Sequence, residues 1–129
     1  MKAASLRKAL VGMATIVIGA AVVYYALIFD GPFPDHPALR GHNDLVLHVA
    51  AFLGLSTSVM LLDSRRCTIA GLVVFAGMIE IVQIFEPRRT ADWLDFAGSV
   101  AGIALAAVLV LGLRWIGTLV ASEGVICDE

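Results

Sequence analysis

Charged residues are scarce in this chain. Asp, Glu, Lys and Arg make up 16% of its 129 residues, whereas 60% are hydrophobic and the mean hydropathy is +0.91. Soluble globular domains contain about 25% charged residues. The shortage of charge excludes an ordinary soluble enzyme. It predicts one integral membrane domain over residues 1–129.

Several functional signatures are also missing. Nine basic and eleven acidic residues give a net charge of −2, without a basic stripe interleaved with aromatic residues, so nucleic acid is not an expected partner. The chain has no obvious nucleophile, no Gly-rich phosphate loop and no H-E-x-x-H motif. Its two cysteines, Cys67 and Cys127, lack a C-x-x-C spacing. No catalytic residue, cofactor or metal is therefore assigned.

The hydrophobic residues form four long runs. These runs predict helices over residues 9–29, 45–62, 67–85 and 94–113, each 18 to 21 residues long. At about 1.5 Å per residue, each helix covers roughly the 30 Å hydrocarbon thickness of a bilayer. Because lipid offers the backbone no hydrogen-bond partner, helices satisfy it where an open sheet cannot. The predicted fold is an all-α bundle of four transmembrane helices.

The first run resembles a secretory signal in its basic start, Lys2, Arg7 and Lys8. Its 21 residues exceed the usual signal core of about 7–15, and no convincing A-x-A cleavage site follows. A retained transmembrane helix is favoured, with a cleaved signal as the alternative.

Basic residues predict the orientation, because cytoplasmic flanks are enriched in Lys and Arg. Cytoplasmic termini put six basic residues inside (Lys2, Arg7, Lys8, Arg65, Arg66, Arg114) and three outside (Arg40, Arg88, Arg89). The predicted topology is N-in/C-in. Tyr24, Tyr25 and Trp93 then mark the outer interface and Trp115 the inner one. Both cysteines fall on the reducing side, so no disulfide is expected.

Small residues at four-residue spacing predict close helix contacts, within the chain or between chains, with contacts within the chain favoured. Two such stripes are present: Gly98, Gly102 and Ala106, and Ala50, Gly54 and Ser58. Gly71 and Gly77 are assigned the same role.

Polar residues at membrane depth are the strongest functional signal, because an ionisable group there costs about 2.5–3.5 kcal/mol. Three pairs lie at helical spacing, so the two members of each pair share one helix face: Asp44 and His48, Glu80 and Gln83, and Asp95 and Ser99. In the N-in topology all three faces meet in the outer leaflet, beneath Arg88 and Arg89. The predicted ligand site comprises Asp44, His48, Glu80, Gln83, Arg89, Asp95 and Ser99.

These residues, in order, resemble the signature of the VanZ-like family of small bacterial membrane proteins. The resemblance covers residues 42–106 and consists of Asp44-x-x-x-His48-x-x-x-Phe52, Glu80-x-x-Gln83-x-x-x-Pro87-x-Arg89, Asp95 and Gly102. It implies a multi-pass protein of the bacterial cytoplasmic membrane, of incompletely defined biochemistry. It also implies a link to teicoplanin-type glycopeptide resistance. Two positions depart from the pattern: Leu45 replaces a common Lys, and Ser99 replaces the usual Asn.

Three functions remain open. The first is binding of an anionic headgroup, such as that of a lipid-linked cell-wall precursor, with Arg89 as counter-ion. The second is a membrane enzyme that uses His48 and Glu80 as an acid/base pair on such a substrate. The third is a structural role, in which cross-helix hydrogen bonds stabilise the bundle by about 0.6–2 kcal/mol. Gln83 fits packing better than chemistry.

A divalent ion is a further possible ligand for part of this set. Asp44, His48, Glu80 and Asp95 carry suitable donors, but a carboxylate-rich set with a single His is poorly specific. The sequence therefore predicts no metal.

Overall fold

The computed structural model describes residues 2–29, 43–86 and 92–123. Within these ranges the chain forms four α-helices, a short π-helix and no strand. The elements are α1 (Lys2–Val23), η1 (Tyr24–Ile28), α2 (Asn43–Leu62), α3 (Arg66–Ile84) and α4 (Trp93–Glu123). Four helical stretches are long and apolar enough to cross a membrane. The predicted all-α bundle is confirmed, and the chain is a multi-pass membrane protein.

Most helix ends fall within one or two residues of the predicted ones, with two exceptions. Helix α1 begins at Lys2 rather than at residue 9, and α4 continues to Glu123 rather than ending at residue 113. Arg and Lys end an apolar run but are good helix formers, so they do not end the helix. Their aliphatic stems lie along the apolar surface while their charges reach water.

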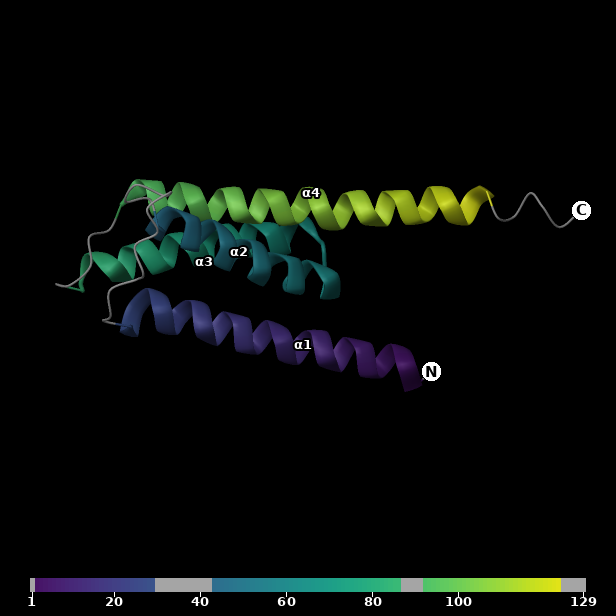
Figure 1. Cartoon of the computed structure of the whole chain (residues 1–129), viewed down its shortest axis with the longest axis horizontal. Coiled ribbons are helices and arrows are strands. Elements are labelled where there is room, and N and C mark those ends of the chain that lie inside the picture. Colours follow the sequence, from purple (N-terminus) through teal and green to yellow (C-terminus); the bar gives the residue numbers. More distant parts are fainter. Residues whose placement is uncertain (1, 30–42, 87–91, 124–129) are drawn as a thin grey trace, which may run out of the picture.

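The helices run side by side along the long axis of the molecule, and the start of α1 and the end of α4 lie at the same end of the bundle (Figure 1). Helix α2 is central, because it contacts α1, α3 and α4. The buried core comes almost wholly from α2, α3 and α4, with Val22 as the one contribution of α1: Val22, Phe52, Leu55, Met60, Leu72, Ala76, Ile79, Ile103, Ala106 and Val110. Helix α1 is thus the most loosely held of the four.

The closest helix contact joins α2 and α4 at two glycines. A Cβ atom at Gly102 would lie 2.5 Å from the Val49 carbonyl oxygen and 2.9 Å from the Leu53 amide nitrogen. A Cβ atom at Gly98 would lie 2.7 Å from Leu45 Cδ1. Any side chain larger than hydrogen would push the two backbones apart. The predicted packing role of the stripe on the fourth helix is confirmed within the chain.

The other small residues follow the prediction only in part, because Ser58 is buried within the chain whereas other members of the set are exposed. Ala50 and Gly54 are exposed, and a Cβ atom at Gly54 would meet nothing within 4 Å, so the expectation that they pack within the chain is wrong. Gly71 also has open space, and Gly77 makes only an ordinary contact with Phe96. Small-residue spacing identifies a possible contact face but does not say which face α2 turns toward its neighbour.

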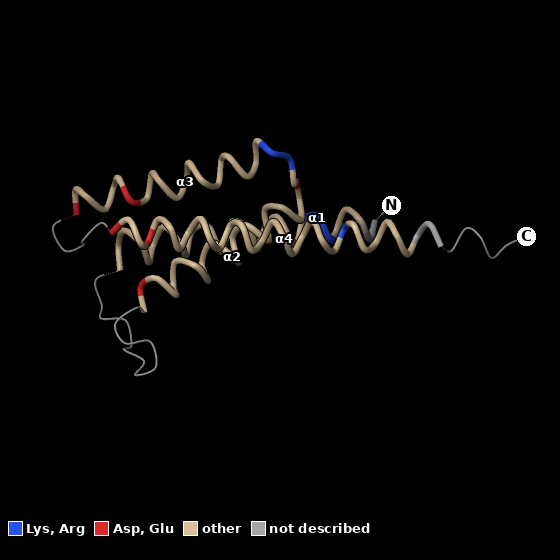
Figure 2. Tube along the Cα trace, turned by 90° about the horizontal axis from the view of Figure 1, so that it is seen from above, with Lys and Arg blue, Asp and Glu red and all other residues tan. Residues whose placement is uncertain are grey.

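Charges are separated along the bundle (Figure 2). The described basic side chains gather at one end: Arg7, Lys8, Arg65, Arg66 and Arg114. There Arg114 donates hydrogen bonds to Ser64 Oγ and to the Met60 carbonyl oxygen, which ties α4 to the end of α2. The opposite end carries Asp44, Glu80, Glu86, Asp92 and Asp95, whereas Asp63 lies at the basic end and pairs with Arg65.

Replacing Gly102 by Ala should destabilise the bundle. The added methyl group would meet backbone atoms of α2, which cannot rotate away, and such overpacking typically costs about 1–3 kcal/mol. We expect the apparent melting temperature in detergent to fall. Gly112→Ala on the same helix is the matched control, because no atom lies within 4 Å of its Cβ position. Equal melting of the two variants would contradict the close contact.

Orientation is tested by reporter fusions at the C-terminus. Because α1 begins and α4 ends at the basic end of the bundle, a cytoplasm-active fluorescent protein should fluoresce and a periplasm-active phosphatase should stay silent. The reverse pattern would place the acidic end in the cytoplasm.

Candidate functional site

Polar side chains gather where α2 begins, α3 ends and α4 begins. His48 lies at their centre: its Nδ1 is 4.0 Å from Glu80 Oε1, and its Nε2 is 4.0 Å from Asp95 Oδ2. The side chains of His48, Glu80 and Asp95 are only 11%, 13% and 10% exposed. With Asp44 and Ser99, these residues are called the polar cluster below. It sits at membrane-helix depth, not in a surface loop.

Ser99 fixes the proton of His48. The Ser99 hydroxyl donates to the Asp95 carbonyl oxygen at 3.0 Å, so its oxygen is left to accept from His48 Nδ1 at 3.1 Å. This hydrogen-bond pattern places the proton of a neutral imidazole on Nδ1. The Nε2 atom then carries the lone pair, on the side of the Asp95 carboxylate.

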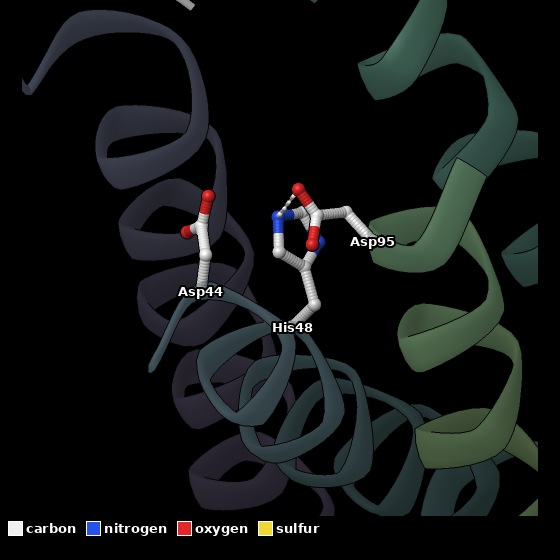
Figure 3. A group of neighbouring side chains, drawn as sticks. All are labelled: Asp44, His48 and Asp95. Carbon is white, nitrogen blue, oxygen red and sulfur yellow. Dashed lines mark ion pairs between the residues drawn. The ribbon is translucent and has the colours of Figure 1, made fainter. Parts of the chain in front are cut away.

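Asp44 completes one side of the polar cluster. It is exposed on the first turn of α2, one turn before His48. One ligand atom each from Asp44, His48 and Asp95 can be chosen so that all three lie within 4.8 Å of one another. Figure 3 shows His48 between the two carboxylates, Asp44 from its own helix and Asp95 from α4. The three side chains therefore bring two carboxylates and one imidazole together, and Asp44 is the exposed member of the three.

Glu80 has an unfavourable environment. Both of its carboxylate oxygens are buried, and neither has a hydrogen-bond partner among the described residues. His48 is the ion-pair partner seen for it, at 4.0 Å. A buried carboxylate without a donor is costly, because it loses water and gains little in return. Its charged form therefore calls for a positive charge close by, and the described basic side chains lie at the other end of the bundle.

An apolar cavity of about 350 Å³ lies beside the polar cluster, between α1, η1 and α2. Asp44, His48 and Tyr25 give it its polar lining. The remaining walls are hydrophobic: Val17, Ile18, Ala21, Val22, Ala26, Leu47, Ala51, Phe52 and Ile79. The contribution of the first helix to this wall was not predicted from the sequence. That helix is hydrophobic all round, so no face stands out.

Gln83 lies apart from the polar cluster. It is 3% exposed, and its Nε2 donates to the Ala26 carbonyl oxygen at 3.0 Å. Ala26 belongs to η1, whose π-helical winding is typical of short helix bulges near functional sites. Gln83 therefore joins α3 to η1, as its predicted packing role requires. It also holds η1 in place beside the cavity.

Of the seven predicted ligand residues, five form the polar cluster, whereas Gln83 joins α3 to η1. Arg89, with Arg88, lies outside the described residues. The hydrogen bond between Ser99 and His48 was not predicted. The spacing placed Ser99 on the right helix face, but it could not show which partner on α2 it meets.

Comparison of the chain with protein-family models, curated proteins and solved structures gives no significant match. The resemblance to the VanZ-like family therefore stays a prediction.

Glu80→Gln should separate packing from function. The amide keeps the shape of the side chain but carries no charge, so we expect an apparent melting temperature equal to or above that of the wild type. If the His48–Glu80 pair mainly stabilises the bundle, removing one charge should instead cost about 3–5 kcal/mol.

The matched variant is Gln83→Leu, which removes the hydrogen bond to Ala26. It should lower stability by about 0.6–2 kcal/mol, the usual value of a polar contact between membrane helices. A Glu80→Gln protein that melts below Gln83→Leu would support a structural role for the polar cluster.

Proposed function

We propose that this protein binds an anionic amphiphile at the outer face of the bacterial cytoplasmic membrane. In this proposal the chain has both termini in the cytoplasm. The lipid tail occupies the apolar cavity, and the headgroup lies at the polar cluster. A lipid-linked cell-envelope precursor has this chemistry.

The proposal is carried by one observation: an apolar cavity of about 350 Å³ whose polar lining, Asp44, His48 and Tyr25, includes two members of the polar cluster. Ligand cavities are usually about 300–1,000 Å³, mostly apolar, with a few polar groups that fix orientation. Polar residues that served helix packing alone would not need an adjoining cavity.

The headgroup would supply most of the binding energy. A lipid tail leaves a bilayer that is as apolar as the cavity walls, so transfer of the tail gains little hydrophobic free energy. The cavity would therefore select the shape of the tail, whereas Asp44, His48 and their neighbours would recognise the headgroup. Arg89 remains the proposed counter-ion for its negative charge.

The resemblance to the VanZ-like family supports the same proposal. A protein that holds a lipid-linked envelope precursor fits a link to glycopeptide resistance, because glycopeptides act on the cell wall that such precursors build. This link is part of the proposal and awaits a phenotype.

Acid–base catalysis on the same ligand is the second candidate. It is favoured by the placement of His48 between two carboxylates and by the fixed proton on Nδ1. Nε2 would act as the base, and the Asp95 carboxylate would stabilise the imidazolium that forms. A purely structural role is less well supported, because Glu80 gains no hydrogen bond from its burial.

The proposal is tested by a phosphatidic acid that carries a photoreactive diazirine in one acyl chain. After irradiation in nanodiscs, mass spectrometry should find crosslinks at the cavity walls, residues 17–26 and 47–52. Ala51→Phe would fill the cavity next to His48 and should reduce these crosslinks several-fold.

Ala104→Phe is the matched control. It makes the same change at an exposed position of α4 that does not line the cavity, so it should leave crosslinking unchanged. Even labelling over all lipid-facing helix surfaces, unaffected by Ala51→Phe, would refute binding in the cavity.

A further inference from the structure

We propose that Asp44, His48 and Asp95 hold a divalent metal ion, of the class of Mn²⁺ or Zn²⁺, which binds the phosphate of the amphiphile. This inference rests on the proposed function for the identity of the ligand, but the metal site itself can be tested alone. The sequence predicts that these residues converge, but a carboxylate-rich set with a single His was too unspecific to assign a metal.

The donor set fits such an ion. One imidazole nitrogen and two carboxylate oxygens suit Zn²⁺ and Mn²⁺, whereas Mg²⁺ and Ca²⁺ prefer oxygen donors alone. The three donor atoms lie within 4.8 Å of one another. Metal bonds of about 2.1 Å would bring them to roughly 3.3 Å apart in a tetrahedral site. The exposed Asp44 side chain is free to make most of this approach.

Ser99 prepares His48 for this role. A histidine that binds a metal through one ring nitrogen almost always donates a hydrogen bond through the other, which fixes the ring and its tautomer. Here Nδ1 contacts the Ser99 hydroxyl at 3.1 Å, and Nε2 faces Asp95 at 4.0 Å. The lone pair therefore points toward the other two donors.

The surrounding charge points to a cation independently. Glu80 brings a third carboxylate to His48, and both of its oxygens are buried without a hydrogen-bond partner among the described residues. The Asp95 side chain is itself only 10% exposed. Three carboxylates at membrane depth repel one another, and each is expensive there. A divalent ion beside His48 would neutralise most of this charge.

The same ion explains how an acidic site could attract an anion. Three protein ligands leave a coordination position open for water or a ligand oxygen. Asp44 and His48 also line the cavity, so the open position would face a headgroup whose tail lies between α1 and α2. A phosphate oxygen can then bind the metal without contacting a carboxylate.

The experiment uses the full chain in detergent, stripped with chelator and titrated with MnCl₂. We expect one Mn²⁺ per chain by electron paramagnetic resonance, with a ¹⁴N coupling from an imidazole ligand in the pulsed spectrum. His48→Gln should abolish the ¹⁴N coupling. Asp44→Asn and Asp95→Asn should each weaken Mn²⁺ binding by tenfold or more.

Ser99→Ala tests the site without removing a ligand. It should weaken Mn²⁺ binding by about 10–100-fold, the usual effect of losing a partner of a ligating histidine. Asp63→Asn is the control, since this carboxylate lies at the other end of the bundle and pairs with Arg65. Absence of ¹⁴N coupling in the wild type, or equal loss of binding in Asp63→Asn and Asp95→Asn, would overturn the site. If His48→Gln does not fold, Mn²⁺ binding by Asp44→Asn still tests the site, because Asp44 is exposed.

A second arm identifies the source of the phosphate. Mn²⁺-loaded protein is placed in phosphatidic acid nanodiscs, or in detergent with inorganic phosphate, and the ³¹P coupling to Mn²⁺ is measured. Coupling in nanodiscs that Ala51→Phe removes supports a lipid phosphate. Coupling to inorganic phosphate alone supports the metal site but refutes the amphiphile. A ¹⁴N coupling without any ³¹P coupling refutes the bridging role.

Discussion

The close approach of α2 to α4 at Gly98 and Gly102 is the contact on which the polar cluster depends. A Cβ atom at Gly98 would lie 3.2 Å from the Leu45 carbonyl oxygen, so the missing side chain lets the start of α2, which carries His48, lie close to α4. Ser99, the next residue, then meets the imidazole at hydrogen-bond distance. In a membrane, where lipid is as apolar as Leu, helices associate through such tight packing, not through a hydrophobic drive. The contact between α2 and α4 thus stabilises the bundle and positions the polar cluster.

Helix α1 packs more loosely than α2 and α4 do. It contributes only Val22 to the core, and it meets α2 across a cavity rather than across interlocked glycines. One polar tie is the Gln83 hydrogen bond to the Ala26 carbonyl oxygen, made where α1 passes into the π-helical η1. A helix held at one end can move to admit a ligand from the bilayer more easily than one packed along its whole length. Under the proposed function, the loosely packed α1 would let the ligand enter, whereas the tightly packed α2 and α4 would hold the polar cluster in place.

The sequence predicts the bundle well because hydrophobicity alone marks the four spans. It also predicts that Asp44, His48, Glu80 and Asp95 converge, since helical spacing fixes faces and alternating topology fixes the shared end. It cannot choose between the faces of an apolar helix. For that reason the prediction that Ala50 and Gly54 pack within the chain was wrong, and the part of the cavity wall formed by α1 was not predicted. Cross-helix partners such as Ser99 depend on helix rotation, which spacing does not reveal.

The polar cluster also constrains how the protein is stabilised. Its ionisable groups each oppose membrane insertion by about 2.5–3.5 kcal/mol, and the small buried core of three helices offers limited compensation. Any ligand that binds only the folded state adds RT ln(1 + [L]/Kd), about 2.7 kcal/mol at a hundredfold excess over Kd. A bound cation would therefore offset close to the insertion cost of one buried carboxylate. The polar cluster thus lowers the stability of the folded protein, and a cation bound there would restore part of it. Cation binding at His48 and its carboxylates would then be coupled to folding.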